Sequence, residues 1–203
     1  MFENLPQEML HARADGGGRV SAALQGLEHR QLLAGARNPE DFATLAFCGV
    51  LARFPIFKLG VSDLRRLIDR FFPGAAATAA NFQAHSPADT ACTGIPPEEL
   101  DDLLALFRAH RLDESEETAW LAHAIASACA GGNHLWEDMG MPNREALSQL
   151  IKKYFPTLYF KNTGNLRWKK FFYKLLCDRA KARICKAPSC GVCSDYSQCY
   201  GPE

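Results

Sequence analysis

Four cysteines lie within the last nineteen residues of this 203-residue chain, in the pattern C-x4-C-x2-C-x5-C. They are Cys185, Cys190, Cys193 and Cys199. The same short segment contains Pro188 and Gly191, which favour turns over a packed helix or strand. Ordinary core packing does not account for so many thiols in such a segment. Thiolates are the softest ligands a protein offers, and they select zinc, copper(I) and iron–sulfur chemistry. The pattern therefore predicts a soft-metal site at this end of the chain.

The cysteine spacing leaves two kinds of metal site open. A structural zinc ion held by four cysteines is common, but such sites usually use two separated C-x2-C pairs, and this segment has one. Plant-type iron–sulfur proteins use C-x4-C-x2-C with a distant fourth cysteine. Cys185, Cys190 and Cys193 match the first three of these positions, whereas Cys199 is much closer than expected. Spacing alone therefore allows an iron–sulfur or mixed-metal cluster, or zinc.

The rest of the chain has the apolar spacing of amphipathic helices, without a convincing alternating strand. We predict an all-α fold: a helical domain over residues 1–181, followed by an irregular cysteine-rich metal-binding segment over 182–203. The expected helices cover 40–53, a stretch from Ser62 or Asp63 to Pro73, one opening at Pro96–Pro97, Ser115 to Gly131, one capped by Asn143, and 166–179. Residues 73–95 are small, polar and proline-containing, which predicts a flexible surface loop.

Charge is distributed unevenly along a chain of zero formal net charge. Residues 150–203 contain eleven Lys or Arg and three acids, so the two parts carry about −8 and +8. A basic end favours an anionic partner, such as nucleic acid, an oxyanion or an anionic cluster. The N-terminus has early acids and no apolar run, and no stretch approaches the length of a membrane span. We expect a cytoplasmic chain without a membrane partner, in a compartment that keeps thiols reduced.

The last predicted helix has two contrasting faces. Its aromatic and leucine side chains share one face that we expect to be buried. On the opposite face we place Lys170, Lys174, Cys177 and Lys181. These lysines either form an ordinary solvated face or stabilise an anionic site beyond the helix, because ammonium groups lower thiol pKa values. Cys177 is a candidate extra ligand or transfer thiol, although a helix C-terminus disfavours a thiolate.

Other candidate residues have simpler interpretations. Cys48 and Cys129 lie in apolar helical stretches and are expected to be core residues, and Cys92 is incidental to its loop. His134 follows a glycine-rich helix stop and precedes two acids. It is interpreted as a capping or core histidine, with binding of metal or oxyanion as the alternative.

Enzyme signatures are absent from the sequence. It contains no G-x-x-x-x-G-K-[ST], G-x-G-x-x-G, H-E-x-x-H or G-x-S-x-G motif, and we do not expect an enzyme. A basic helix beside a zinc knuckle would suit nucleic acid. That partner is disfavoured because most aromatics face the predicted core, which leaves Tyr173, Tyr196 and Tyr200 for base stacking.

Three sequence blocks in order resemble one known family. HLWEDMG at 134–140, RWKKFFYKLLC at 167–177 and the four-cysteine pattern together are similar to the NifQ family, with the resemblance running from about Trp120 to Gly201. The resemblance implies a molybdenum–iron–sulfur cluster that supplies molybdenum for the nitrogenase iron–molybdenum cofactor. It implies molybdate as the metal source, and the nitrogenase iron protein and the cofactor-assembly scaffold as partners.

By position, the resemblance makes Cys185, Cys190, Cys193 and Cys199 the cluster ligands. We therefore expect a metallochaperone-like molybdenum donor in nitrogen fixation. The alternatives are a zinc-stabilised module that binds nucleic acid or protein, and an electron-transfer iron–sulfur protein without molybdenum.

Overall fold

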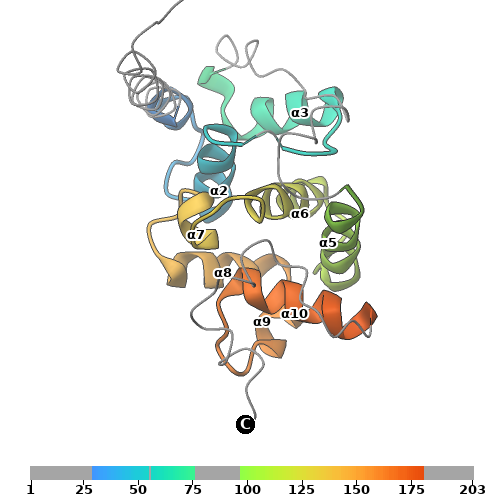
Figure 1. The fold of residues 1–203 in the computed structure, drawn as a ribbon. Helices are drawn as coiled ribbons and strands as arrows, with labels where there is room; N and C mark the ends of the chain where they lie inside the picture. Colours follow the sequence, from blue (N-terminus) through green and yellow to red (C-terminus); the bar gives the residue numbers. More distant parts are fainter. Residues whose placement is uncertain (1–28, 55, 76–96, 181–203) are drawn as a thin grey trace, which may run out of the picture.

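The computed structural model describes residues 29–54, 56–75 and 97–180, which form helices joined by turns (Figure 1). The elements are α2 (Phe42–Leu51), α3 (Val61–Phe71), η1 (Pro73–Ala75), α5 (Pro97–His110), α6 (Glu116–Ala128), α7 (Leu135–Asp138), α8 (Arg144–Tyr154), α9 (Pro156–Lys161) and α10 (Trp168–Ala180). Residues 29–34 are also helical. These ranges contain no β-strand, which confirms the all-α prediction for this part of the chain. The predicted cysteine-rich segment 182–203 and its boundary lie outside the described residues.

Two helices begin at the cap residues that the sequence predicts, and one helix begins elsewhere. The Ser115 hydroxyl accepts a hydrogen bond from the Thr118 N–H at 3.2 Å, and the Asn143 side chain accepts from the Ala146 N–H at 2.8 Å. Both predicted caps are confirmed. The prediction of Ser62 or Asp63 as a cap is wrong, because α3 already begins at Val61. Asp63 instead lies in the first turn, where a carboxylate interacts favourably with the helix dipole.

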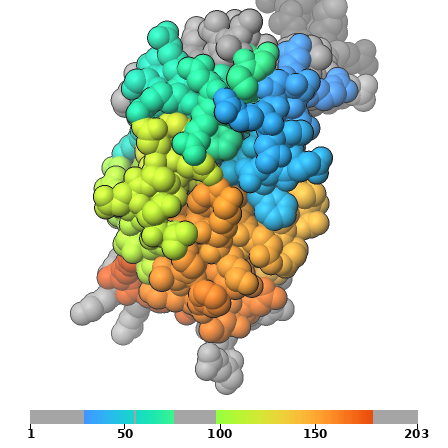
Figure 2. All heavy atoms as spheres, turned by 180° about the vertical axis from the view of Figure 1, so that it is seen from behind, coloured from blue at the N-terminus to red at the C-terminus, as the bar shows by residue number. Residues whose placement is uncertain are grey.

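Helix α6 lies in the middle of the molecule, with α2 and α3 on one side and α8, α9 and α10 on the other (Figure 1). Its sequence, EETAWLAHAIASA, is apolar almost all round after the acidic first turn. A helix of that kind is stable when it is covered on several sides. From the back of the molecule, α8 and α9 in orange adjoin α2 in blue and the yellow-green α5 (Figure 2).

Aromatic side chains join α5, the α8–α9 turn and α10 in the lower part of the core. Phe107 of α5 lies with its ring centroid 5.2 Å from Phe155 and 5.0 Å from Phe172. All three rings are fully buried. Each such aromatic pair stabilises the fold by about 0.5–1.5 kcal/mol beyond the stabilisation from burying its surface. This contact fixes the lateral position of α10, which lines the site described below.

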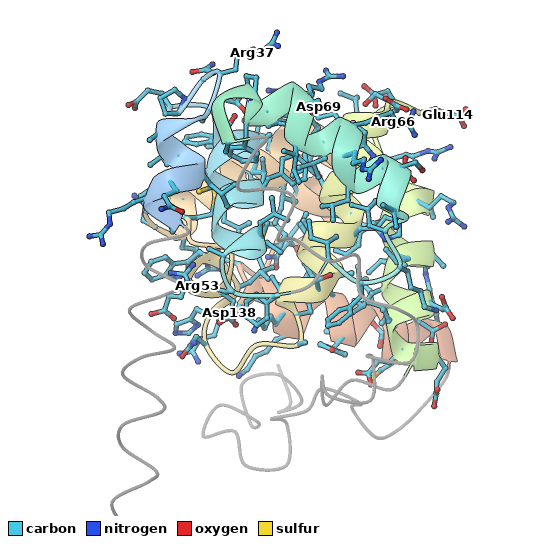
Figure 3. The ribbon with its side chains drawn as sticks, turned by 90° about the horizontal axis from the view of Figure 1, so that it is seen from above. Arg37, Arg53, Arg66, Asp69, Glu114 and Asp138 are labelled. Atoms are coloured by element: carbon cyan, nitrogen blue, oxygen red, sulfur yellow. The ribbon has the colours of Figure 1, made fainter. Side chains whose placement is uncertain are left out.

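Two glycines let the segment after α7 approach α2 closely. A Cβ on Gly49 of α2 would lie 2.1 Å from the Met139 carbonyl oxygen, so any larger residue would collide with backbone. Gly140 has a φ of +64°, a conformation that favours glycine. Arg53, which follows α2, is labelled near Asp138 in Figure 3, and its Nη1 would lie 2.7 Å from a Cβ on Gly140. The glycines therefore hold α7 at a defined distance from α2.

The predicted loop over 73–95 is partly wrong at its start. Pro73–Ala75 form a short 3-10 helix, and Ala75 is buried. The Gly74 N–H donates to the Gly35 carbonyl at 3.0 Å, a close approach that the missing side chains of both glycines permit. Residues 76–95 of that prediction lie outside the described residues.

Among the described residues, no helix combines the length and the apolar character needed to cross a membrane.

Candidate functional site

The four cysteines that the sequence singles out, Cys185, Cys190, Cys193 and Cys199, lie outside the described residues. Over 29–54, 56–75 and 97–180, no group of three or more His, Cys, Asp or Glu side chains is arranged to hold a metal ion. The described helix closest to the cysteines in sequence is α10, which ends at Ala180. The other end of α10, at Trp168, borders a cavity.

A cavity of about 570 Å³ lies between α7, the first turns of α8 and the start of α10. It is lined by Gly132, Asn133, His134, Leu135, Trp136, Glu137, Arg144, Leu147, Arg167, Trp168, Lys169 and Lys170. We refer to it as the basic pocket. The lining combines parts of two blocks that carried the sequence resemblance, 134–140 and 167–177. Residues that are about thirty positions apart in the chain thus form one concave surface.

A buried carboxylate joins the walls of the basic pocket. Asp138, at the end of α7, is 2 % exposed. Its Oδ2 accepts from the Lys169 ammonium at 2.5 Å and from the Asn133 N–H at 3.2 Å, while its Oδ1 accepts from the Asn133 side-chain amide at 3.0 Å. Lys169 also donates to the Gly131 carbonyl at 2.7 Å. Asp138 therefore ties the turn before α7 to α10, and a charge-assisted contact of this kind is stronger than a neutral one.

Gly131 is required by this arrangement. A Cβ at that position would lie 2.2 Å from Asp138 Oδ2, inside the space that the carboxylate occupies. Helix α7 follows, with His134 at its N-cap, and the His134 backbone N–H donates to Glu137 Oε2 at 2.9 Å. His134 is exposed and precedes the first residue of α7. The predicted capping position is confirmed, the core alternative is not, and the side chain lines the pocket.

Arg144 holds the opposite wall. Its Nη2 donates to the Asn165 carbonyl at 2.7 Å, to the Asn165 side-chain oxygen at 2.8 Å and to the Leu166 carbonyl at 2.9 Å. Asn165 has a φ of +50°, a left-handed conformation that asparagine tolerates well. These bonds fix the turn that leads into α10. All three acceptors are neutral oxygens, so these three bonds do not neutralise the charge of the guanidinium.

The electrostatics of the basic pocket follow from its lining. Four basic side chains, Arg144, Arg167, Lys169 and Lys170, face two carboxylates, the lining Glu137 and the underlying Asp138. Asp138 is paired with Lys169, and basic side chains outnumber carboxylates in this lining. A concave site that concentrates one sign of charge attracts ligands of the opposite sign.

The structure corrects the predicted faces of α10. Tyr173 is 1 % exposed and Cys177 is 4 % exposed, so placing Cys177 on an open lysine stripe and Tyr173 among residues available for base stacking was wrong. The helix packs against more than one neighbour: Phe172 contacts Phe107 of α5, and the Trp168 indole N–H donates to the Ser148 hydroxyl of α8 at 3.0 Å. Contacts on several sides bury a wider arc than one amphipathic stripe. Lys170 and Lys174 remain partly exposed, and Lys181 lies outside the described residues.

The remaining described cysteines are core residues, as predicted. Cys48 and Cys129 are 0 % and 2 % exposed. Burial raises the pKa of each thiol to about 12, so both are protonated at neutral pH. A protonated, buried thiol is a poor nucleophile and metal ligand.

The described residues thus define an all-α protein with a basic pocket at the start of its last helix. The sequence profile of the NifQ family matches residues 44–201, which is most of the chain and includes the cysteine motif. The chain belongs to the NifQ family.

Individual relatives agree with this assignment. A NifQ protein of Azotobacter vinelandii is 42 % identical over 106 residues, which cover 52 % of this chain and 54 % of the relative. A NifQ protein of Rhodobacter capsulatus is 35 % identical over 148 residues, covering 72 % of this chain and 77 % of the relative. A NifQ homolog of Sinorhizobium fredii is 35 % identical over 139 residues, or 68 % of this chain and 58 % of that protein. The matches thus span little more than half the length of the first and third of these relatives. No solved structure matches the chain.

Proposed function

We propose that this protein carries a molybdenum–iron–sulfur unit on Cys185, Cys190, Cys193 and Cys199 and donates molybdenum for assembly of the nitrogenase iron–molybdenum cofactor. The cluster is cargo, and the protein acts as a metallochaperone-like donor in the cytoplasm, not as an enzyme. Its acceptors are the cofactor-assembly scaffold and the nitrogenase iron protein, and molybdate is the source of the metal.

The observation that carries this proposal is the four-cysteine pattern inside the matched region of the family. The match runs to residue 201 and so includes all four cysteines in their order and spacing. An all-thiolate ligand set suits iron–sulfur chemistry. A cluster bound by four thiolates carries negative charge, which the basic residues of 150–203 stabilise.

The division between helical domain and metal segment is part of the proposal. The described helices bury a core of their own, with members from Leu32 to Leu176. In this proposal the motif binds and releases its cargo without unfolding of that core.

A transfer assay tests the donor function. Protein loaded with molybdenum and iron is mixed anaerobically with the assembly scaffold and the reduced iron protein, in buffer without added molybdate. After separation, we expect molybdenum in the scaffold fraction in proportion to the donor added. A scaffold that stays free of molybdenum, while molybdate itself supplies the same mixture, would contradict donation.

The runner-up is a zinc-stabilised module that binds nucleic acid or protein. It predicts a colourless, oxygen-tolerant protein, whereas an iron–sulfur cluster gives a brown, oxygen-labile one. An absorbance spectrum before and after exposure to air separates the two.

A further inference from the structure

We infer that the acceptor protein docks where α5, α9 and the end of α10 meet, and that it presents an acidic surface around an apolar recess. That the partner is a metal acceptor rests on the proposed function, whereas its acidic character rests on this junction itself. The residues that form the surface, which we call the junction patch, are His110, Leu112, Phe160, Lys161 and Arg179.

Hydrogen bonds around His110 join the three helices at the junction patch. Arg179 Nη2 of α10 lies 3.2 Å from His110 Nε2, and because arginine is only a donor, this ring nitrogen accepts. The proton of the neutral ring is therefore on Nδ1, which donates to the Thr157 hydroxyl of α9 at 2.8 Å. The same hydroxyl donates to the His110 carbonyl at 3.3 Å. The end of α10 is thus tied to α5 and α9, and in Figure 1 it lies below α5.

The described contacts of the junction patch do not neutralise its two permanent positive charges. The described partner of Arg179 is the neutral His110 ring, and no carboxylate in the described part of the chain pairs with Lys161. Burial lowers the pKa of His110, and the nearby charges of Lys161 and Arg179 lower it further. The ring is therefore mostly uncharged at neutral pH, and both cations lie close to it.

The acidic side chains next to the patch in the sequence have contacts of their own. Asp178 lies 3.8 Å from the Lys174 ammonium, and Glu114 forms an ion pair with Arg111. The Asp113 carboxylate accepts from the N-cap hydroxyl of α6 at 2.7 Å. Two of these three acids are thus matched by basic groups outside the patch, and the third serves the start of α6. The two patch charges remain for a partner.

The two most exposed large apolar side chains of the described residues also lie at this junction. Phe160 is 66 % exposed and Leu112 is 61 % exposed. Phe160 follows Thr157 by three residues and so lies on the side of α9 that meets α5. The Leu112 N–H donates to the Tyr154 carbonyl, just before α9, at 2.8 Å. Aromatic residues and arginine are enriched where proteins bind one another, which favours a protein interface here.

The position of the patch in the chain keeps the cargo within reach of a partner bound there. Cys185 follows Arg179 by six residues. A chain spans at most about 3.6 Å per residue, so the two residues are no more than about 22 Å apart. An interface of standard size buries about 800 Å² on each partner, an area about 16 Å in radius. A partner centred on the patch therefore comes within reach of the first thiolate.

An acidic protein surface fits the junction patch better than nucleic acid does. Nucleic acid is bound by basic grooves that follow its phosphates, with aromatic rings on which successive bases stack. The patch offers two permanent charges, one exposed ring and the aliphatic Leu112, which has no ring to stack on a base. Carboxylates around an apolar recess would match both the charges and the apolar side chains.

The test measures equilibrium binding of the full chain, purified anaerobically with its metal, to the immobilised assembly scaffold and to the immobilised iron protein. Lys161→Glu and Phe160→Ala are each expected to weaken binding to the acceptor about tenfold. Added salt is expected to reduce the effect of Lys161→Glu much more than that of Phe160→Ala, because salt screens charges. Both side chains are exposed, and thermal melting verifies that each variant folds.

The matched controls are Arg65→Glu and Val61→Ala on α3. Arg65 is an exposed basic residue and Val61 is 55 % exposed, so the pair repeats the chemistry of Lys161 and Phe160. Helix α3 lies at the opposite end of the molecule from α9 (Figure 1). Both controls are expected to bind the acceptor as the unmodified protein does.

Three results would overturn the inference: no binding to either protein, equal binding by patch variants and unmodified chain, or equal weakening by the α3 controls. Binding of a single-stranded oligonucleotide that Phe160→Ala weakens, with no binding to either protein, would reassign the patch to nucleic acid.

The same samples separate this inference from the proposed function. Weaker binding by the patch variants, with no molybdenum transfer from the unmodified protein, would support the docking surface and contradict donation. Molybdenum transfer from the unmodified protein, with equal binding by the patch variants, would support donation and contradict the docking surface.

Discussion

Substitution of Cys190 by serine is expected to remove iron and molybdenum from the anaerobically purified protein while leaving its helix content nearly unchanged. A hydroxyl is a much harder ligand than a thiolate and does not replace it at a soft-metal site. The described helices bury a core of their own, with members from Leu32 to Leu176, and Cys190 lies outside the described residues. Elemental analysis measures the metals, and far-ultraviolet circular dichroism measures the helices.

The matched control for that substitution is Cys92→Ser. Cys92 has the same chemistry but lies far from the motif in the chain. It is expected to retain the metal content of the unmodified protein. Loss of the whole fold in Cys190→Ser would contradict a helical domain that is stable without the motif, and equal metal loss in Cys92→Ser would contradict the proposed ligand set.

The largest loss of stability in the described domain is expected from Asp138→Ala. The substitution leaves the Lys169 ammonium, 18 % exposed, without its carboxylate partner. It also removes the acceptor of both Asn133 donors, the backbone N–H and the side-chain amide. Breaking a buried ion pair by removing one member costs about 3–5 kcal/mol. Denaturation by urea, followed by circular dichroism, measures the change in the free energy of unfolding.

Glu137→Ala is the natural comparison for Asp138→Ala. Glu137 is the neighbouring carboxylate, but it is exposed and accepts one described hydrogen bond, from the His134 N–H. Its loss is expected to cost about 1 kcal/mol. If Asp138→Ala destabilised the protein no more than Glu137→Ala, the buried contact would not hold α7 and α10 together as described.

Local features of the fold were predictable because they depend on neighbours in the chain. The hydroxyl of Ser115 and the amide of Asn143 bond N–H groups three residues ahead, and the sequence shows both members of each pair. The start of α3 was missed because Gly60, at its N-cap, has no side chain with which to signal a cap. The four cysteines stand out by composition and spacing alone.

The basic pocket was not predictable in the same way. Two contacts join its walls. Asp138 and Lys169 are 31 residues apart in the sequence, and Arg144 and Asn165 are 21 residues apart. The adjacent Arg167, Lys169 and Lys170 were a usable signal of a basic site, but no local pattern joins them to Arg144. The burial of Tyr173 and Cys177 likewise depends on the helices that pack around α10. Helical periodicity alone does not predict these neighbours.

Elemental analysis tests most directly whether this protein carries a molybdenum–iron–sulfur unit. The sample is the unmodified protein, purified anaerobically from cells supplied with molybdate. If the protein carries this unit, the analysis will find molybdenum together with several iron atoms per chain, and little zinc. About one zinc per chain, with neither iron nor molybdenum, would contradict the account and favour a structural zinc module.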